Sequence, residues 1–144
     1  MEDPSMHLPD YAAIELDDEI PLLEMPPLTR QILAIYCGAS GDHNPIHVDI
    51  DFARESGLDD VIAHGMLIMA YMGRALTNWV PQGAIRSFDT RFQAMTRIGD
   101  AITVRGRIAE KFDDAGTPCV RVELTATDQR GDVKTAGGAV IAFA

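Results

Sequence analysis

The stretch SGDHNPIHVDIDFARESGLDDVIAHGM, residues 40–66, concentrates three of the chain's four histidines, a run of carboxylates and loop-forming glycines in one short span. Its Asn44-Pro45 dipeptide favours a turn, so the chain is expected to fold back on itself between Asp42 and His47. An imidazole titrates near neutrality, and an adjacent carboxylate can orient it or share in proton transfer. The stretch therefore predicts an acid-base pair, around which the rest of the chain is organised.

Two other uses of these residues stay open. In the simpler one, Asp42 caps a turn and His47 is an ordinary polar loop residue. In the other, Asp42, His47 and His64 supply a carboxylate and two imidazoles, which form a common set of metal ligands. No H-x-x-x-H pair falls on a predicted helix, so we expect no metal.

Helical patterns flank this stretch on both sides. The following sequence, MLIMAYMGRALTNWVP, is apolar nearly all round for its first two turns, which predicts a buried helix over about residues 66–80. Before the stretch, Thr29 is a good N-cap, and apolar residues recur at helical spacing until Gly38 and Gly41 end the pattern. This predicts a short amphipathic helix that leads directly to Asp42.

The remainder of the chain changes its period. Residues 84–95, 100–112, 118–128 and 132–143 alternate in polarity or are rich in β-branched side chains, with turn residues between them. We interpret them as antiparallel strands joined by hairpins. One long buried helix followed by a run of strands indicates an α+β domain in which a sheet wraps the helix.

The segment IYCGASGDHNPIHVDIDFARESGLDDVIAHGM, residues 35–66, resembles the signature of the MaoC-like dehydratases, which include the (R)-specific enoyl-CoA hydratases. The matching pieces are Tyr36, Ser40-Gly41-Asp42, Asn44-Pro45-Ile46-His47, Ala53, Gly57 and Ile62-Ala63-His64-Gly65-Met66. The resemblance extends from about Leu28 to the C-terminus. It implies the hot-dog fold, in which a curved antiparallel sheet surrounds a central helix, here at about residues 66–80.

The same resemblance implies a reaction and its residues. The substrate would be a trans-2-enoyl thioester of coenzyme A or acyl carrier protein, reversibly hydrated to the (3R)-3-hydroxyacyl thioester without a cofactor or metal. Asp42 and His47 match the family's catalytic pair, and the backbone N–H of Gly65 matches its oxyanion hole. We expect Asn44 to shape the loop, while His64 either braces it or takes part in proton transfer.

Arginines form a second group of candidates. Arg86, Arg91 and Arg97 belong to a cluster that extends to Arg107. They could contact the phosphates of a pantetheine or coenzyme A carrier, or they lie on a solvated strand face that balances nearby acids.

Other functions and assemblies are compatible with this resemblance. The chain could be the catalytic subunit of a heteromeric dehydratase, a hot-dog thioesterase, or a non-catalytic protein that binds acyl thioesters. Residues 66–80 contain no Asp or Glu, which disfavours a thioesterase because those enzymes commonly place a carboxylate base there. The family resemblance implies a homodimer, a higher oligomer or a heterodimer with another hot-dog chain.

Length and composition limit the remaining choices. The 144 residues are sufficient for one domain with a single core. A net charge of −10 excludes nucleic acid and anionic membranes as expected partners. We expect residues 1–25 to form an acidic, partly ordered leader and residues 26–144 to form the domain. The N-terminus does not resemble a signal peptide, and the two cysteines are far apart, which together predict a reducing, cytoplasmic location.

Overall fold

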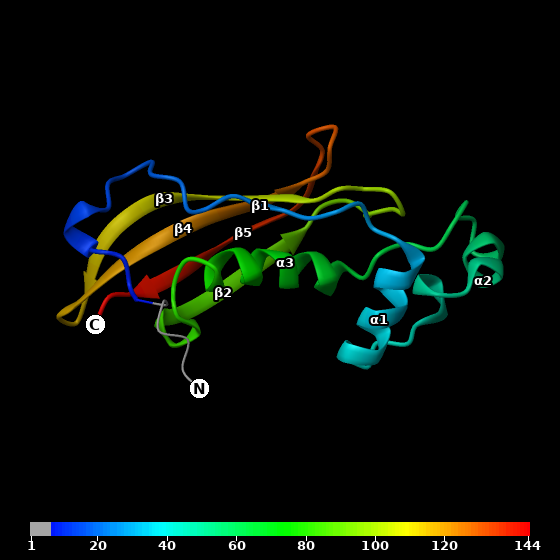
Figure 1. The fold of residues 1–144 in the computed structure, drawn as a ribbon, viewed down its shortest axis with the longest axis horizontal. Coiled ribbons are helices and arrows are strands. Elements are labelled where there is room, and N and C mark those ends of the chain that lie inside the picture. The colour runs from blue at the N-terminus through cyan, green and yellow to red at the C-terminus, as the bar shows by residue number, and fades with distance from the viewer. Residues whose placement is uncertain (1–6) are drawn as a thin grey trace.

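A curved antiparallel sheet and one central helix form the core of the computed structural model, which describes residues 7–144 (Figure 1). This arrangement confirms the predicted α+β hot-dog architecture. Its elements, in chain order, are η1 (Tyr11–Ala13), β1 (Leu23–Glu24), α1 (Arg30–Ser40), η2 (Pro45–His47), α2 (Ile50–Glu55), α3 (Gly65–Thr77), η3 (Gln82–Ala84), β2 (Ile85–Phe92), β3 (Thr103–Asp114), β4 (Thr117–Thr127) and β5 (Val133–Ala142).

The five strands lie in the order β1-β3-β4-β5-β2, and all neighbours are antiparallel. Along β4, buried residues alternate with more exposed ones, because successive side chains of a strand point to opposite faces. The buried set faces α3, and its members on β4 are Val120, Val122, Leu124 and Ala126. This alternation is the period that predicted the strands from the sequence.

Helix α3 lies within the curve of the sheet (Figure 1). Its buried side chains are Leu67, Ile68, Tyr71, Met72, Ala75 and Leu76. Two glycines of the helix face aromatic rings of β2: Gly65 faces Phe92, and Gly73 faces Phe88. A Cβ at Gly65 would come within 3.1 Å of the Phe92 ring, whereas a Cβ at Gly73 would make an ordinary van der Waals contact with Phe88.

The segment before α1 packs along the free edge of β3. Ile14, Ile20 and Leu23 belong to the hydrophobic core, and the side chain of Lys111 donates hydrogen bonds to the carbonyls of Tyr11 and Ile14. Within residues 7–29, which the structure describes, only Leu23–Glu24 forms a strand. Residues 1–6 of the predicted acidic leader lie outside the described residues.

Helices α1 and α2 form a separate lobe at one end of the sheet (Figure 1). As predicted, Thr29 caps α1, since its hydroxyl accepts a hydrogen bond from the Ile32 N–H at 3.2 Å. The helix ends at Gly41, whose φ of 76° is the left-handed conformation that glycine adopts without strain. Asp42 follows at once, so the end of α1 positions the first candidate catalytic residue.

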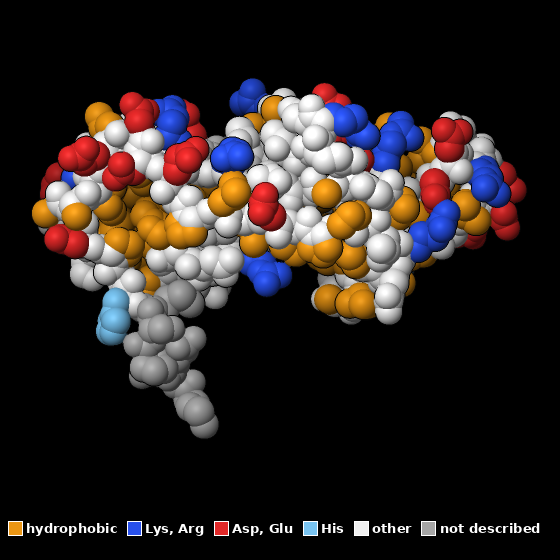
Figure 2. Space-filling model, turned by 45° about the horizontal axis from the view of Figure 1, so that its top comes forward, with side chains coloured by type: hydrophobic (Ala, Val, Ile, Leu, Met, Phe, Trp, Pro, Cys, Tyr) orange, Lys and Arg blue, Asp and Glu red, His pale blue; other side chains and the backbone are white. Residues whose placement is uncertain are grey.

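The surface carries both signs of charge. On the face in Figure 2, acidic side chains gather toward both ends, and basic ones lie among them rather than in one extended patch. This distribution fits the net charge of −10 and offers no broad basic surface for a phosphate backbone on that face. Within the described residues, every helix is too short or too polar to cross a bilayer.

Candidate active site

Asp42 lies in a loop whose own hydrogen bonds orient its carboxylate. Its backbone N–H donates to the hydroxyl of Ser40 at 3.1 Å, and its Oδ1 accepts the N–H of Asn44 at 3.2 Å. Asn44 in turn accepts the N–H of Ile46 on its side-chain oxygen at 3.1 Å and caps η2. These short-range bonds leave Oδ2 of Asp42 free to face His47.

His47 is nearly buried, with 9% of its surface exposed. Its Nδ1 lies 2.8 Å from the carbonyl oxygen of Ile62. A carbonyl only accepts hydrogen bonds, so Nδ1 carries the proton in the neutral ring and Nε2 presents a lone pair. Nε2 lies 3.9 Å from Oδ2 of Asp42, and the structure therefore brings together the two residues that the turn predicted.

The gap between these two atoms suits a water molecule. At 3.9 Å the imidazole and the carboxylate are too far apart for a direct hydrogen bond. A water oxygen at about 2.8 Å from each atom can lie between them and donate to both. The pair is thus arranged to withdraw a proton from a bound water.

His64 packs directly against His47. The two rings stack with their centroids 3.7 Å apart and their planes 23° apart, and the ring of Tyr36 makes a T-shaped contact with His64 at a centroid distance of 4.7 Å. Nε2 of His64 lies 3.2 Å from the carbonyl oxygen of Asp42 and 3.4 Å from the sulfur of Cys37. His64 therefore contacts both members of the candidate pair through its ring and one nitrogen.

The protonation state of His64 follows from this environment. The ring is only 1% exposed, and Nδ1 has no hydrogen-bond partner among the described residues. Burial lowers the pKa of His64, the nearby His47 lowers it further, and the hydrogen bond to Asp42 and the charge of that residue oppose the shift. His64 is consequently a neutral ring with its proton on Nε2.

A cavity of about 380 Å³ opens beside these residues. Gly65 lies at its edge as the first residue of α3, where the N–H has no acceptor within the helix. The helix dipole also favours negative charge at this end. The remaining lining is mainly apolar and comes from the segment before α3, from α3, from the end of β2 and the segment after it, and from β5. The lining residues are His47, Ile62, Ala63, Gly65, Ile68, Phe92, Gln93, Ala94, Met95, Thr96 and Thr135.

The same cluster has the composition of a metal site. Asp42, His47 and His64 each offer an atom, and these atoms lie within 4.8 Å of one another. The stacked rings oppose such a use, however, because imidazole lone pairs lie in the ring planes and nearly parallel planes do not converge on one ion. The hydrogen on Nε2 of His64 also occupies the nitrogen that faces Asp42.

The predicted arginines occupy different places. Arg86 lies near the start of β2 and lines a small cavity at the far end from His47. Arg91 lies near the end of β2 and lines a second cavity of about 350 Å³, which shares Gln93 with the first. Arg97 comes directly after the lining residue Thr96 in the sequence, and its side chain is exposed. The structure thus brings Arg91 and Arg97, but not Arg86, to the end of β2 where the site lies.

Several site residues were not singled out from the sequence. The Ile62 carbonyl that orients His47 has no side-chain signature. Phe92 and Met95 were assigned only to a strand pattern, and Thr96 lay outside the predicted strands. Their place in the wall depends on how the end of β2 passes over α3. Exposed hydrophobic residues, such as Phe92 at 51% and Met95 at 49%, could indicate a binding site, but their exposure is known only from the folded chain.

Comparisons with known proteins show which sequences and folds this chain resembles. Residues 15–130 match the family model described as MaoC like domain. An (R)-specific enoyl-CoA hydratase from Rhodospirillum rubrum is 37% identical over 90 residues, covering 58% of this chain and 62% of that protein. A 3-hydroxybutyryl-CoA dehydratase from Methylorubrum extorquens is 31% identical over 134 residues, covering 87% and 80%. R-hydratase PhaJ1 from Pseudomonas aeruginosa superposes with a TM-score of 0.78 at 26% identity, covering 92% and 84%.

Some relatives are much longer than this chain. The match spans 62% of the Rhodospirillum enzyme, whose length is similar to that of this chain, but only 4% of a fatty acid synthase subunit beta from Aspergillus oryzae, which is far longer. Two solved complexes from Mycobacterium tuberculosis, ChsH1-ChsH2 and HadBC, share the fold with TM-scores of 0.75 and 0.65 at 19% and 17% identity. Their likeness shows that this fold occurs in heteromeric assemblies.

Proposed function

This chain belongs to the MaoC-like family of hydratases and dehydratases, and from that premise we propose that it is a hydro-lyase acting on acyl thioesters. The reaction is the reversible addition of water to a trans-2-enoyl thioester, which gives the (3R)-3-hydroxyacyl thioester. The observation that carries the proposal is the 3.9 Å gap between His47 Nε2 and Asp42 Oδ2, beside a cavity that Gly65 also lines.

In this reaction the acid-base pair acts on one water. The water loses a proton to the pair as its oxygen bonds to the β-carbon, while a proton is delivered to the α-carbon and the carbon–carbon double bond becomes single. The Nδ1–H bond to Ile62 keeps the lone pair of His47 Nε2 directed at the water. Positioned acid-base groups of this kind typically contribute about 10²- to 10⁴-fold in rate.

The thioester carbonyl needs a separate group. Negative charge develops on its oxygen as the enolate forms, and in our proposal the N–H of Gly65 stabilises it; the support is that Gly65 is the first residue of α3 and lines the cavity. The apolar wall accommodates the acyl chain. The carrier is coenzyme A or acyl carrier protein, and Arg91 and Arg97 are the candidates for its phosphates because each is exposed near this end of β2.

A hydratase fits the cavity better than a thioesterase does. Within the described residues, no Asp or Glu lines the cavity or lies on α3, and the carboxylate of Asp42 beside the cavity already belongs to the proposed acid-base pair. We therefore expect the enzyme to change the enoyl absorbance of its substrate without releasing free thiol.

We propose that the chain works as a dimer, either with a second copy or with another hot-dog chain, and needs no metal or cofactor. The support is the position of β2 at the edge of the sheet, because an unpaired strand edge is a template for pairing with another chain. Exposed Phe92 and Met95 at the end of this strand would be covered by such a partner.

The decisive experiment follows the loss of enoyl absorbance with crotonyl-CoA and a longer trans-2-enoyl-CoA. We expect wild type to form the (3R) product, and Asp42→Asn and His47→Ala to lose about 10²-fold or more of kcat. His43→Ala is the matched control because His43 is exposed in the same loop, and it should retain the wild-type rate. Full activity of a folded His47→Ala variant would overturn the proposed mechanism.

A further inference from the structure

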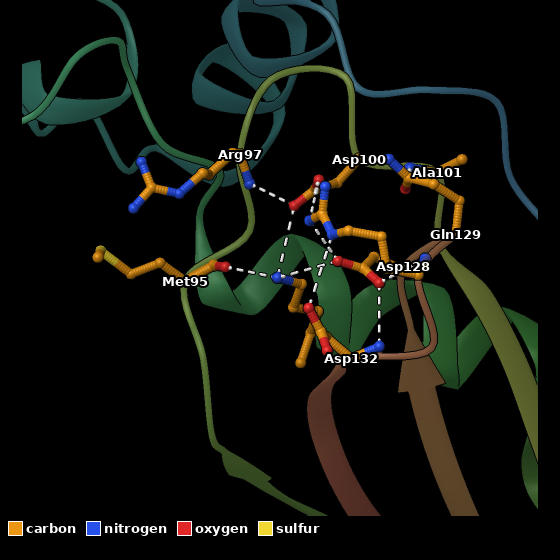
Figure 3. Close-up of polar contacts among 9 residues, drawn as sticks. Met95, Arg97, Asp100, Ala101, Asp128, Gln129 and Asp132 are labelled. Atoms are coloured by element: carbon orange, nitrogen blue, oxygen red, sulfur yellow. Dashed lines mark hydrogen bonds and ion pairs between the residues drawn. The ribbon is translucent and has the colours of Figure 1, made fainter.

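A buried ionic cluster lies behind the cavity wall, and the proposed reaction does not use it (Figure 3). Lys134, at the start of β5, is 5% exposed, and the carboxylates of Asp100 and Asp128 are in residues only 2% and 4% exposed. The Nζ of Lys134 lies 3.6 Å from Asp100 and 3.4 Å from Asp128. Arg130 reaches the same two carboxylates from the surface.

Stability by itself does not account for this cluster. Lysine is almost never fully buried unless paired, and desolvation of a buried ion pair often cancels its Coulomb attraction. Apolar residues of similar volume could fill the same space with equal or greater stability. We therefore expect these charged side chains to hold the segments that they contact in a fixed position.

Lys134 contacts the segment that forms the cavity wall. Its Nζ donates to the carbonyl of Met95 at 3.0 Å, and its own carbonyl accepts the N–H groups of Gln93 at 2.9 Å and Ala94 at 3.3 Å. Asp100 accepts the N–H of Arg97 on Oδ2 at 2.8 Å. In Figure 3, the dashed lines from Met95 and Arg97 both run from this short segment toward the cluster that contains Asp100 and Asp128.

The wall is in turn bonded to the catalytic segment. The carbonyl of Thr96, between the two anchored residues, accepts the N–H of Ala63 at 2.9 Å. Ile62 forms a β-bridge with Arg97, and the carbonyl of Ile62 accepts the Nδ1–H of His47. Ala63 is two residues before Gly65, so one backbone path links the buried cluster to both the base and the oxyanion donor.

We propose that Lys134 is a positioning residue for the active site. Lys134 is held by Asp100 and Asp128, and it fixes the position of residues 93–97. These residues in turn hold Ile62 and Ala63 in register. The positions of Ile62 and Ala63 then set the tautomer of His47 and the direction of the Gly65 N–H. The proposal rests on the proposed hydration reaction for its kinetic consequence. Its structural consequence, the fixed tautomer of His47, does not depend on that reaction.

The test compares Lys134→Met with Arg130→Met. Both changes remove one cation from the cluster and keep an unbranched side chain, but only Lys134 bonds to the wall, while Arg130 lies on the outer side with 55% of its side chain exposed. Lys134→Met leaves the buried carboxylates with one cation. The double variant Lys134→Met with Asp128→Asn restores that charge balance, keeps an oxygen at position 128 and still lacks the donor to Met95.

Kinetics on crotonyl-CoA and nitrogen NMR of the histidine side chains supply the two measurements. A displacement of about 1 Å at a reacting group can cost about 10²-fold, so we expect kcat to fall at least about tenfold in the single and double variants, with KM changed by less than about threefold. In the same spectra, His47 should lose its single Nδ1–H tautomer. Arg130→Met should lower stability but keep wild-type kcat and the wild-type tautomer.

Two results would overturn the inference. One is wild-type kcat and an unchanged His47 tautomer in the folded double variant. The other is an equal loss of kcat in Arg130→Met, which would make the cluster a general stabiliser rather than a positioning device. Failure of wild type to hydrate any enoyl thioester would instead contradict the proposed function, and the NMR comparison would still decide the role of Lys134.

Discussion

His47 owes its orientation to two neighbours that act at right angles to each other. The carbonyl of Ile62 holds the ring within its plane through Nδ1, and the stacked ring of His64 supports its face. Because the backbone of Asp42 also bonds to His64, one buried side chain keeps the base and the carboxylate at a constant separation. Substitutions here can therefore separate the role of each atom.

The backbone donor at Gly65 can be removed by proline. Proline is tolerated at the first position of a helix, and His64 already has the extended conformation that a following proline requires, with φ −59° and ψ 130°. Gly65→Pro should lower kcat by about 10²- to 10³-fold, which is the usual effect of losing one oxyanion donor. Initial-rate kinetics on crotonyl-CoA measures this effect.

Gly65→Ala is the control for that change. An added Cβ at either substitution comes within 3.1 Å of the Phe92 ring, but alanine keeps the N–H. Alanine should therefore retain most of the activity that proline loses. Equal losses in the two variants would assign the effect to crowding by Phe92 instead of to the hydrogen bond.

His64 should make the protein sensitive to acid. Its pKa is lowered by burial, so the unfolded state binds a proton at a pH where the folded state does not. The free energy of unfolding is then highest above the unfolded pKa of about 6.5 and falls as the pH drops from there toward the folded pKa. Urea unfolding at about pH 7.5 and about pH 5 should show a smaller acid loss in His64→Gln than in wild type.

His43→Gln provides the comparison for this experiment, because His43 lies in the loop next to Asp42 and is exposed to solvent. It should lose as much stability on acidification as wild type does. An acid loss that is identical in wild type and His64→Gln would show that His64 keeps its ordinary pKa in the folded chain.

Removal of divalent metals should leave the activity unchanged. The nearly parallel rings of His47 and His64 direct their lone pairs along separate planes, and the proposed proton transfers need no Lewis acid. Extended dialysis against a strong chelator, followed by assay with crotonyl-CoA, measures this directly. Activity that disappears with the chelator and returns with one added cation would identify a metal enzyme.

At the scale of elements, the contact between β5 and β2 depends on a residue without a side chain. A Cβ at Gly137 would overlap the carbonyl of Asp89 and the Cα of Thr90 on β2, which pairs directly with this part of β5. The strands approach closely here, and β2 continues into the segment that walls the cavity. Gly137 thus helps to place the cavity wall although it lies outside the cluster of Asp42, His47 and His64.

Gly137→Ala should separate these strands and lower the free energy of unfolding by at least about 3 kcal/mol, the upper end of ordinary overpacking effects, since backbone cannot move aside as a side chain can. Denaturant unfolding measures the change. Gly83→Ala is the control, because a Cβ there meets no atom within 4 Å. A Gly137→Ala variant as stable as this control would mean that β2 can shift without cost.

At the scale of the whole molecule, the half-barrel leaves one long strand, β2, at an edge of the sheet. We expect the purified chain to sediment at about twice the mass of one chain, since edge pairing would satisfy the free backbone groups and cover Phe92. Sedimentation equilibrium over a range of concentrations tests this. A stable single chain that hydrates enoyl thioesters at full rate would contradict it, and a chain active only after co-expression with another hot-dog protein would identify a heteromer.

The sequence by itself determined the main helices and strands and the loop that carries Asp42 and His47. Helical spacing after Thr29, the apolar run after Gly65 and the alternating segments after residue 84 each depend on neighbours a few positions apart, and so does the turn that brings Asp42 near His47. Local hydrogen bonds and side-chain periodicity act over that range, which is why these predictions are confirmed as structure.

Only the tertiary structure decided how the site is held. The stacking of His64 on His47, the bond from Ile62 to the imidazole and the anchoring of Met95 by Lys134 join residues from different elements. No periodicity or motif specifies such contacts, because they arise when a curved sheet closes over α3 and strand ends meet loops. A buried lysine among alternating strand residues has the same sequence pattern as an exposed one, and the physical difference between them is the set of partners that folding supplies.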